Sequence, residues 1–311
     1  MDFDIPQDIS DYLNVLDAFI EAEIVPLQEQ DDNIRFFDHR REWARTDFEN
    51  GGLPRPEWEE LLREAKALAD KAGHFRFGLP SEYGGQDGSN LAMAIIREHL
   101  ARKGLGLHND LQNEHSIVAN YPQILMLRDF ARPEQKHLIQ DALDGKFKAT
   151  FGLTEPDFGS DAGGMLTRAK KVDGGYSLSG AKNWITNSPV ADVMVVWAKS
   201  GDHEGKIRGF ILERGMDGLE TPKIEGKFSL RASVTGMIQM ADVFVPEENL
   251  LPNVSGLAGP FGCLNRARYG ISWGAMGAAE FCWHAARQYT LDRKQFGRPL
   301  AQNQLIQKKL A

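Results

Sequence analysis

Apolar residues recur at helical spacing through much of the first 148 residues. Near the N-terminus they are separated by steps of three and four, which is typical of a helix with one buried stripe. This stripe consists of Ile9, Leu13, Leu16, Ile20, Ile24 and Leu27. A second helical pattern begins at Pro56, and Ser89 is the predicted N-cap of a third. We therefore predict an all-helical N-terminal domain over residues 1–148.

Near residue 147 the period of the pattern changes from 3.6 to 2. Arg168–Val172 and the residues after Asp173-Gly174-Gly175 alternate like two strands joined by a hairpin turn. Further strand patterns occupy Val193–Trp197, Arg208–Leu212 and Met237–Val245. Strands at this spacing, without helices between them, predict an antiparallel barrel or sandwich over residues 149–255.

Beyond Pro260 the helical pattern returns. A long segment rich in small residues, which permits helices to approach closely, precedes an amphipathic pattern over Leu300–Ala311. That second pattern shows neither a cap nor a breaker at its end, so we expect the chain to stop inside a helix, as a C-terminally truncated chain would. Residues 256–311 then form the beginning of a C-terminal helical bundle. The predicted fold class is α+β, with an incomplete bundle.

Composition narrows the possible functions. Hydrophobic residues make up 42% of the chain, and its apolar runs are too short for a membrane-spanning helix. The net charge is −8, which argues against a general nucleic-acid-binding surface, so an anionic ligand needs a local site. The spacing of Cys263 and Cys282 suggests neither a disulfide framework nor a zinc site, so we interpret both as buried thiols and expect no metal site. The acidic N-terminus lacks a targeting pattern, and we expect a cytoplasmic protein.

The stretch Phe151–Asp161 is the densest group of special residues in the chain. Gly152 and Gly159 permit close approach of the backbone to a ligand, while Thr154 and Ser160 supply hydroxyls for ring heteroatoms or phosphate oxygens. Taken alone, the stretch is equally well interpreted as a tight connection between strands.

A second stretch, Lys182–Asn187, carries a large aromatic residue two positions from a hydroxyl. On a strand, Trp184 and Thr186 point to the same side. A flat ring next to a hydrogen-bond donor suits a planar cofactor.

Four motifs together resemble the acyl-CoA dehydrogenase family. They are Thr-Glu-Pro-Asp-Phe-Gly-Ser-Asp at 154–161, Trp-Ile-Thr-Asn at 184–187, Val-Pro-Glu-Glu-Asn at 245–249 and Asp-Arg-Lys-Gln-Phe-Gly at 292–297. From Phe151 onward the sequence is most similar to the glutaryl-CoA dehydrogenase branch, through Gly-Lys-Phe-Ser-Leu-Arg-Ala-Ser at 226–233 and Gly-Pro-Phe-Gly-Cys-Leu-Asn at 259–265.

The resemblance implies an FAD-dependent enzyme that desaturates an acyl-CoA thioester between its α and β carbons. Such enzymes pass a hydride to flavin N5 and then deliver electrons to an electron-transfer flavoprotein. FAD is expected between the β-domain and the C-terminal bundle and across a subunit interface, which implies a homodimer or homotetramer. We expect no nucleic-acid and no membrane partner.

The same resemblance assigns residues to FAD. Thr154 is expected to bond to the pyrimidine side of the flavin, Trp184 to cover the ring, and Thr186 to donate to N5. Arg293 resembles an arginine that reaches the pyrophosphate of a neighbouring subunit's FAD; the alternative is a solvated arginine at a helix end. The full predicted set is Phe151, Gly152, Leu153, Thr154, Ser160, Trp184, Ile185, Thr186, Arg293, Phe296 and Gln304.

For the acyl-CoA the resemblance assigns Ser160, Phe261, Asn265 and Arg268. The helix segment from Phe261 is expected to line the pantetheine, with Arg268 close to the reacting end. Arg266 and Arg268 offset CoA phosphates locally, unless they form an exposed pair. Arg231 is expected to make a buried ion pair instead of a ligand contact.

A base for the α-proton is missing from the predicted set. Most members of the family carry this glutamate in a Tyr-Glu-Gly-Thr type motif that would fall beyond Ala311, and a minority carry it where Ala267 stands here. We therefore identify no catalytic residue and expect little dehydrogenation by this chain alone. Weaker candidates are Glu98, Glu114, His115, Glu155, Asp161 and Glu280, of which Glu155 is expected to be a structural hydrogen-bond acceptor.

The substrate class also departs from the glutaryl-CoA dehydrogenase pattern. His108 stands where that branch holds a distal carboxylate with arginine, and a neutral imidazole is a poorer anchor. Two alternatives to a dehydrogenase therefore stay open: a non-catalytic module that binds FAD or acyl-CoA, and a flavin oxidase or monooxygenase of the same fold.

Overall fold

The computed structural model describes residues 4–38, 40–109, 117–231 and 233–311. Its contacts divide the chain into two compact units. The first unit consists of Met1–Phe37, Leu62–Asn120 and Arg268–Ala311, and the second of Asp38–Leu61 and Tyr121–Ala267. This division by contacts differs from the three sequence segments named above, which stay a prediction about domains.

The N-terminal stripe of the first unit is buried as predicted. It lies on α1 (Gln7–Phe19), a π-helical stretch (Ile20–Ile24) and α2 (Val25–Glu29), and five of its six apolar residues are buried. Residues spaced four apart shift gradually around an α-helix, which has 3.6 residues per turn. The wider turn of the π-helix brings residues at this spacing back to one face. Pro26, which lacks an N–H for the preceding turn, explains why the wide turn falls here.

Helix α4 (Asn90–Arg102) begins at the predicted cap, because Ser89 Oγ accepts a hydrogen bond from Ala92 N at 3.1 Å. Part of α7 (Ala258–Asp292) packs against it in the same unit. A Cβ placed on Gly277 would lie 2.2 Å from the backbone oxygen of Glu98, so only glycine permits this approach. The small residues of α7 therefore serve close helix packing, as predicted.

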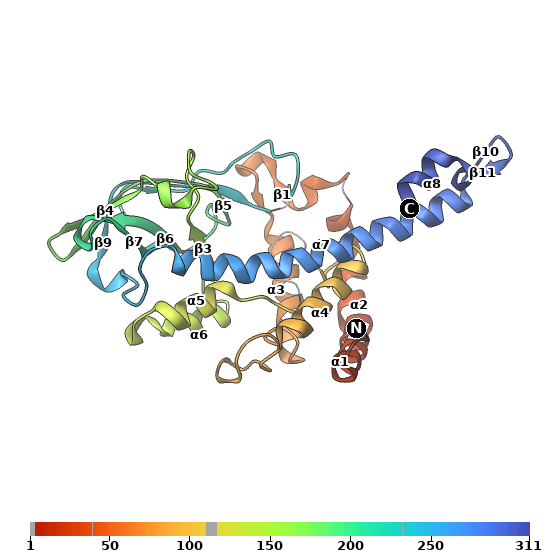
Figure 1. The fold of residues 1–311 in the computed structure, drawn as a ribbon, viewed down its shortest axis with the longest axis horizontal. Coiled ribbons are helices and arrows are strands. Elements are labelled where there is room, and N and C mark those ends of the chain that lie inside the picture. Colours follow the sequence, from red (N-terminus) through yellow and green to blue (C-terminus); the bar gives the residue numbers. More distant parts are fainter. Residues whose placement is uncertain (1–3, 39, 110–116, 232) are drawn as a thin grey trace. The chain divides into compact units, whose positions relative to one another are not determined.

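The second unit is built on a curled seven-stranded sheet (Figure 1), with strand order β3-β6-β4-β5-β9-β8 and β7 added on β6. The strands are β3 (Ala149–Gly152), β4 (Arg168–Val172), β5 (Gly175–Thr186), β6 (Val193–Ser200), β7 (Lys206–Glu213), β8 (Leu219–Glu220) and β9 (Thr235–Pro246). Its core is aliphatic and aromatic, and includes Tyr176, Leu178, Val196, Phe210 and Val243.

The prediction of a purely antiparallel sheet is wrong. Strand β6 pairs parallel with both β3 and β4, while the remaining pairs are antiparallel. The β4–β5 hairpin follows β3 in the chain, and β6 then returns between β3 and β4 in the direction of both. Periodicity within a strand carries no information about which strand becomes its neighbour.

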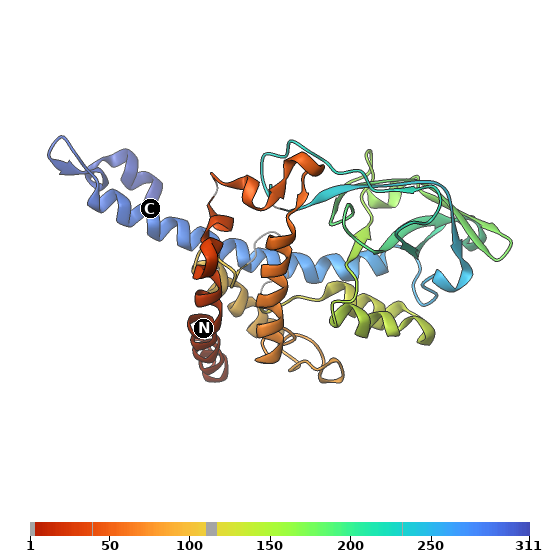
Figure 2. The ribbon, with the colours of Figure 1, turned by 180° about the vertical axis from the view of Figure 1, so that it is seen from behind.

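Short elements complete the second unit. Helices α5 (Pro122–Phe130) and α6 (His137–Leu143) lie side by side in both views (Figures 1 and 2). The first 148 residues are not entirely helical, because β1 (Thr46–Asp47) pairs with β2 (Leu53–Pro54).

Helix α3 (Pro56–Lys71) runs from the end of segment 38–61 of the second unit into segment 62–120 of the first, and α8 (Gln304–Leu310) is the last helix of the described chain. Among the described residues, every helix is too short or too polar to cross a bilayer.

Candidate functional site

The two stretches singled out in the sequence lie next to each other in the second unit. The backbone N–H of Asn183 donates to the carbonyl of Thr154 at 2.8 Å. Four residues earlier, Thr150 Oγ1 donates to the carbonyl of Thr186 at 2.5 Å. These bonds fix the end of β3, and the turn that follows it, against the end of β5.

Trp184 projects outward because β5 contains an irregularity at this point. Lys182 pairs with Ile238 of β9, but Ile185 already pairs with Gly236, so β5 holds one extra residue. Trp184 has φ = 60° in the left-handed region, at a cost of about 1 kcal/mol for a non-glycine residue. Its side chain is 58% exposed. Bulges re-aim side chains in this way, and an exposed indole on a strained backbone is typical of a binding surface.

Hydroxyls accompany the indole. Thr154 is half-buried, while Ser160 and Thr186 are exposed, so all three are open to a ligand from outside. Leu153 and Ile185 are buried, which leaves only their backbone groups for a ligand.

The two glycines of the turn differ from each other. A Cβ on Gly152 would lie within 3.5 Å of Ile238, Lys182 and Val196, so the missing side chain serves packing inside the unit. Around Gly159 the nearest atom is Thr154 Cγ2 at 4.0 Å, so the backbone there is open to close approach.

Beneath this surface lies a buried ion pair. Lys182 Nζ donates to Glu155 Oε1 at 2.8 Å, and the two side chains are 0% and 5% exposed. The carboxylate also accepts from Leu166 N at 2.6 Å, Thr167 N at 3.0 Å and Thr167 Oγ1 at 2.5 Å. Glu155 is therefore the structural acceptor that the sequence predicted.

The pKa values follow from this arrangement. Burial alone raises the pKa of Glu155, but the donors from Lys182, Thr167 and Leu166 outweigh it and hold that pKa below its ordinary value. Burial lowers the pKa of Lys182, and the bond to Glu155 offsets part of that change.

Sequence reasoning missed Lys182 and Thr167. The sequence carries no local signal for them: alternation along a strand places Lys182 on the same side as Trp184, whereas the bulge in β5 leaves Lys182 buried and Trp184 exposed.

The residues assigned to acyl-CoA are exposed. Phe261 and Asn265 lie four positions apart on α7 in the second unit and therefore share one helix face. Arg268, which belongs to the first unit, is also exposed. Arg266 is less available for a phosphate, because its Nη2 lies 3.4 Å from Asp129 Oδ2.

The remaining FAD candidates lie in the first unit, around the short strands β10 (Lys294–Gln295) and β11 (Arg298–Pro299). Arg293 and Gln304 are exposed, and Phe296 is 100% exposed with φ = 52°. Among the described residues of this unit, then, nothing buries the phenyl ring of Phe296.

Of the candidate bases, Glu114 and His115 lie outside the described residues. Glu280 Oε1 lies 3.6 Å from Arg102 Nη1, which partly offsets its charge, and 3.6 Å from His284 Nε2. Asp161 caps the short helical turn that follows it, through Gly164 N at 3.2 Å. Glu98 is partly buried on α4.

His108 is buried in the first unit, and its Nε2 has no hydrogen-bond partner among the described residues. Burial lowers its pKa to about 4, although backbone carbonyls of Gly104 and Leu100 act in the opposite direction. The imidazole is therefore neutral at neutral pH, as expected for a poor carboxylate anchor.

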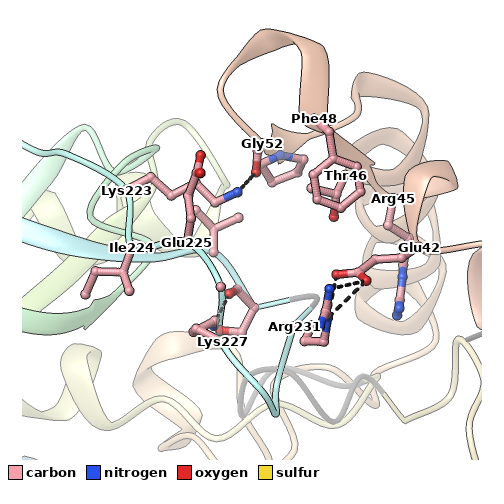
Figure 3. Close-up of a pocket in the computed structure, with 14 residues that line it drawn as sticks. Glu42, Arg45, Thr46, Phe48, Gly52, Lys223, Ile224, Glu225, Lys227 and Arg231 are labelled. Carbon is pink, nitrogen blue, oxygen red and sulfur yellow. Dashed lines mark hydrogen bonds and ion pairs between the residues drawn. The ribbon is translucent and has the colours of Figure 1, made fainter.

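A separate cavity of about 140 Å³ lies in the second unit between residues 42–54 and 223–234 (Figure 3). Its cations already have acceptors: Lys223 donates to the carbonyl of Gly52, and Lys227 Nζ donates to Leu230 O, Ser233 O and Thr235 Oγ1. Arg231 pairs with Glu42 at 2.9 Å. The expected ion pair is present, but Arg231 is 52% exposed, so the expectation of burial is wrong.

Comparison with protein families gives three consecutive matches. Residues 13–143 match the N-terminal domain of acyl-CoA dehydrogenases, residues 150–243 the middle domain and residues 255–311 the C-terminal domain.

Individual relatives are similar at about one-third identity. The chain is 31% identical to a glutaryl-CoA dehydrogenase of Desulfococcus multivorans over its whole length, covering 74% of that protein. It is 34% identical to the caffeyl-CoA reductase-Etf complex subunit CarC of Acetobacterium woodii, over 79% of the chain and 65% of the subunit. The chain therefore spans a little under two thirds of CarC.

Among solved structures, a glutaryl-CoA dehydrogenase of Mycobacterium smegmatis in complex with FADH2 is similar, with a TM-score of 0.74 and 31% identity. The match covers 98% of this chain and 71% of that one.

Proposed function

Because the chain belongs to the acyl-CoA dehydrogenase family, we propose that it binds FAD and an acyl-CoA thioester for α,β-dehydrogenation. The observation that carries the proposal is the exposed Trp184, projected by a bulge beside Thr154 and Thr186. A planar ring, two hydroxyls and an open backbone at Gly159 fit a flavin better than a flexible aliphatic ligand.

In this proposal Trp184 stacks on the flavin, and the indole supplies a flat apolar surface that excludes water from the ring. Thr154 and Thr186 donate hydrogen bonds to the ring edge, and Ser160 marks the end of the turn where substrate is bound. FAD, when bound, supplies the hydride acceptor that amino-acid side chains lack.

Phe261 and Asn265 would hold the pantetheine on the exposed face that they share on α7. Asn265 offers both a donor and an acceptor, which suits the amides of pantetheine. Arg268 would offer a guanidinium to the acyl-CoA. Arg293, Phe296 and Gln304 would contact FAD of a second subunit, since each is exposed.

We further propose that the α-proton is removed by a carboxylate other than the described candidates. Glu155 already accepts four hydrogen bonds, and a carboxylate with a lowered pKa is a weak base. The position used by a minority of the family holds Ala267. Residues 1–311 alone would then bind both ligands without rapid desaturation.

The test uses the purified 311-residue chain loaded with FAD. We expect a yellow protein whose flavin stays oxidised when it is mixed anaerobically with glutaryl-, isovaleryl- and butyryl-CoA, while each thioester perturbs the flavin spectrum. Trp184→Ala is expected to weaken FAD binding. Failure of the chain to bind FAD overturns the proposal, and rapid bleaching overturns the assignment of the base.

The second candidate function is a non-catalytic FAD and acyl-CoA binding module, and Ala267 favours it for this chain in isolation. Supplying a chemical reductant and then an electron-transfer flavoprotein separates the two: reoxidation of the flavin by that partner supports a role in electron transfer. Fast oxygen consumption by the reduced chain would instead favour an oxidase or monooxygenase.

A further inference from the structure

We propose that Glu155 and Lys182 are positioning residues of the FAD site, which fix the Thr154–Ser160 turn relative to Trp184. This inference rests on the proposed function, because it assigns a role to residues that would not touch FAD themselves. Neither residue belongs to the set that was assigned to FAD or to acyl-CoA from the sequence.

The first step is that one carboxylate joins three separate segments. Glu155 belongs to the turn after β3, Leu166 and Thr167 to the loop before β4, and Lys182 to β5. Their four donors converge on its two oxygens at 2.5 to 3.0 Å. Movement of any one segment breaks a charge-assisted bond inside the protein, where no water replaces it.

The second step is that the joined segments carry the ligand-facing groups. Thr154 immediately precedes Glu155, and Trp184 follows Lys182 by two residues across the bulge. Between them, the carbonyl of Thr154 accepts from Asn183 N at 2.8 Å. A fixed distance between Glu155 and Lys182 therefore fixes the distance between the predicted hydroxyl and the predicted stacking surface.

The third step concerns the path of the lysine. The Lys182 stem passes over Gly152, where an added Cβ would lie 3.3 Å from Lys182 Cγ. The side chain is fully buried, so its ammonium has no route to solvent. An apolar pair of similar volume would remove both buried charges, but it would leave the donors of Leu166 and Thr167 without an acceptor and would carry no directional bonds. We therefore infer that the pair Glu155–Lys182 serves to hold the turn and β5 in a fixed relative position.

The experiment measures FAD affinity and the flavin spectrum of four proteins: wild type, Lys182→Met, Thr167→Val and the double variant Glu155→Leu/Lys182→Met. The apoproteins are titrated with FAD, and the residual fluorescence of bound flavin reports its contact with Trp184. Lys171→Met is the matched control, since it removes the partly exposed pair Lys171–Glu247 at 2.9 Å, and the lysine's contact over the Tyr176 ring, elsewhere in the same sheet.

We expect Lys182→Met and the double variant to bind FAD about tenfold more weakly, the loss of one well-placed bond, and Thr167→Val to show a smaller change in the same direction. Bound flavin is expected to fluoresce more strongly in these variants and as in wild type in Lys171→Met. Partial recovery of thermal stability in the double variant relative to Lys182→Met, without recovery of affinity, separates positioning from folding.

Wild-type affinity in the double variant or in a folded Thr167→Val protein overturns the positioning role while the proposed function stands. If Lys182→Met does not fold, these two variants decide the question. If wild type binds no FAD, the proposed function fails and this inference fails with it.

Discussion

Each unit contains a buried ionisable group, and the group in the second unit keeps its charge whereas the group in the first unit loses it. In the second unit, Glu155 is buried with four donors and its pKa lies below the ordinary value. In the first unit, His108 is buried, its Nε2 has no hydrogen-bond partner in the part of the chain that the structure describes, and burial lowers its pKa to about 4. Four donors, one of them a charged ammonium, preserve the charge of Glu155, whereas desolvation outweighs the backbone carbonyls around His108 and keeps the imidazole uncharged.

The difference bears on function. A charge that is kept and fully hydrogen-bonded is suited to hold backbone segments in place, which is the role proposed for the pair Glu155–Lys182. A histidine that stays neutral gives a distal substrate carboxylate no ionic anchor. Because the family resemblance places His108 where a distal carboxylate would be held, the proposed function predicts a preference for acyl groups without a second carboxylate.

The largest expected effect comes from breaking the buried pair. Lys182→Met leaves Glu155 without its ammonium partner in a site closed to water, and the free energy of unfolding should fall by about 3–5 kcal/mol. Chemical denaturation of the apoprotein, followed by circular dichroism, measures the change.

The double variant Glu155→Leu/Lys182→Met is the control for this prediction. It removes both charges, but it also leaves Leu166 N and the two Thr167 donors without an acceptor, so only part of the lost stability should return. If the double variant is as unstable as Lys182→Met, the loss of these bonds and of the lysine stem's packing over Gly152 outweighs the removal of the charge.

The second effect is a pH dependence from His108. Its folded-state pKa of about 4 lies below the unfolded value of about 6.5, so between these values only the unfolded chain takes up the proton. The contribution of neutral His108 to the free energy of unfolding is therefore fully present above pH 6.5. It is lost as the pH falls toward 4, by an amount on the order of 3 kcal/mol. Denaturation midpoints of wild type across this range measure the loss.

His108→Gln removes the titrating group but keeps a side-chain amide that can donate to the carbonyls of Gly104 and Leu100. The slope of stability against pH between 6.5 and 4 should flatten in this variant. An unchanged slope would mean that other groups cause the acid sensitivity. His74 is one such group, because burial lowers its pKa as well.

Local patterns in the sequence predicted much of this architecture. The strand Arg168–Val172 and the cap at Ser89 agree with the structure to the residue, because both depend on neighbours along the chain. The parallel pairing of β6 was missed, because it depends on which distant strands become neighbours.

The site shows the same limit. Glu155 was predicted to be a structural acceptor from its place in a turn, but its partner Lys182 lies 27 positions away and leaves no local signal. The exposure of Trp184 beside a buried lysine depends on a bulge that is defined only by the register with β9. The FAD and acyl-CoA assignments came from family motifs, and they stay predictions.

The smallest expected effect comes from the ion pair between Arg231 and Glu42, which is partly exposed to solvent. Arg231 and Glu42 form two hydrogen bonds of 3.0 Å or less, yet the arginine is half exposed, so water competes for both groups. Arg231→Gln should lower the melting temperature by much less than Lys182→Met. The difference should disappear in 1 M salt, where the screening length is about 3 Å. A loss that persists in high salt would mean that Arg231 stabilises the cavity by packing, because packing is not screened.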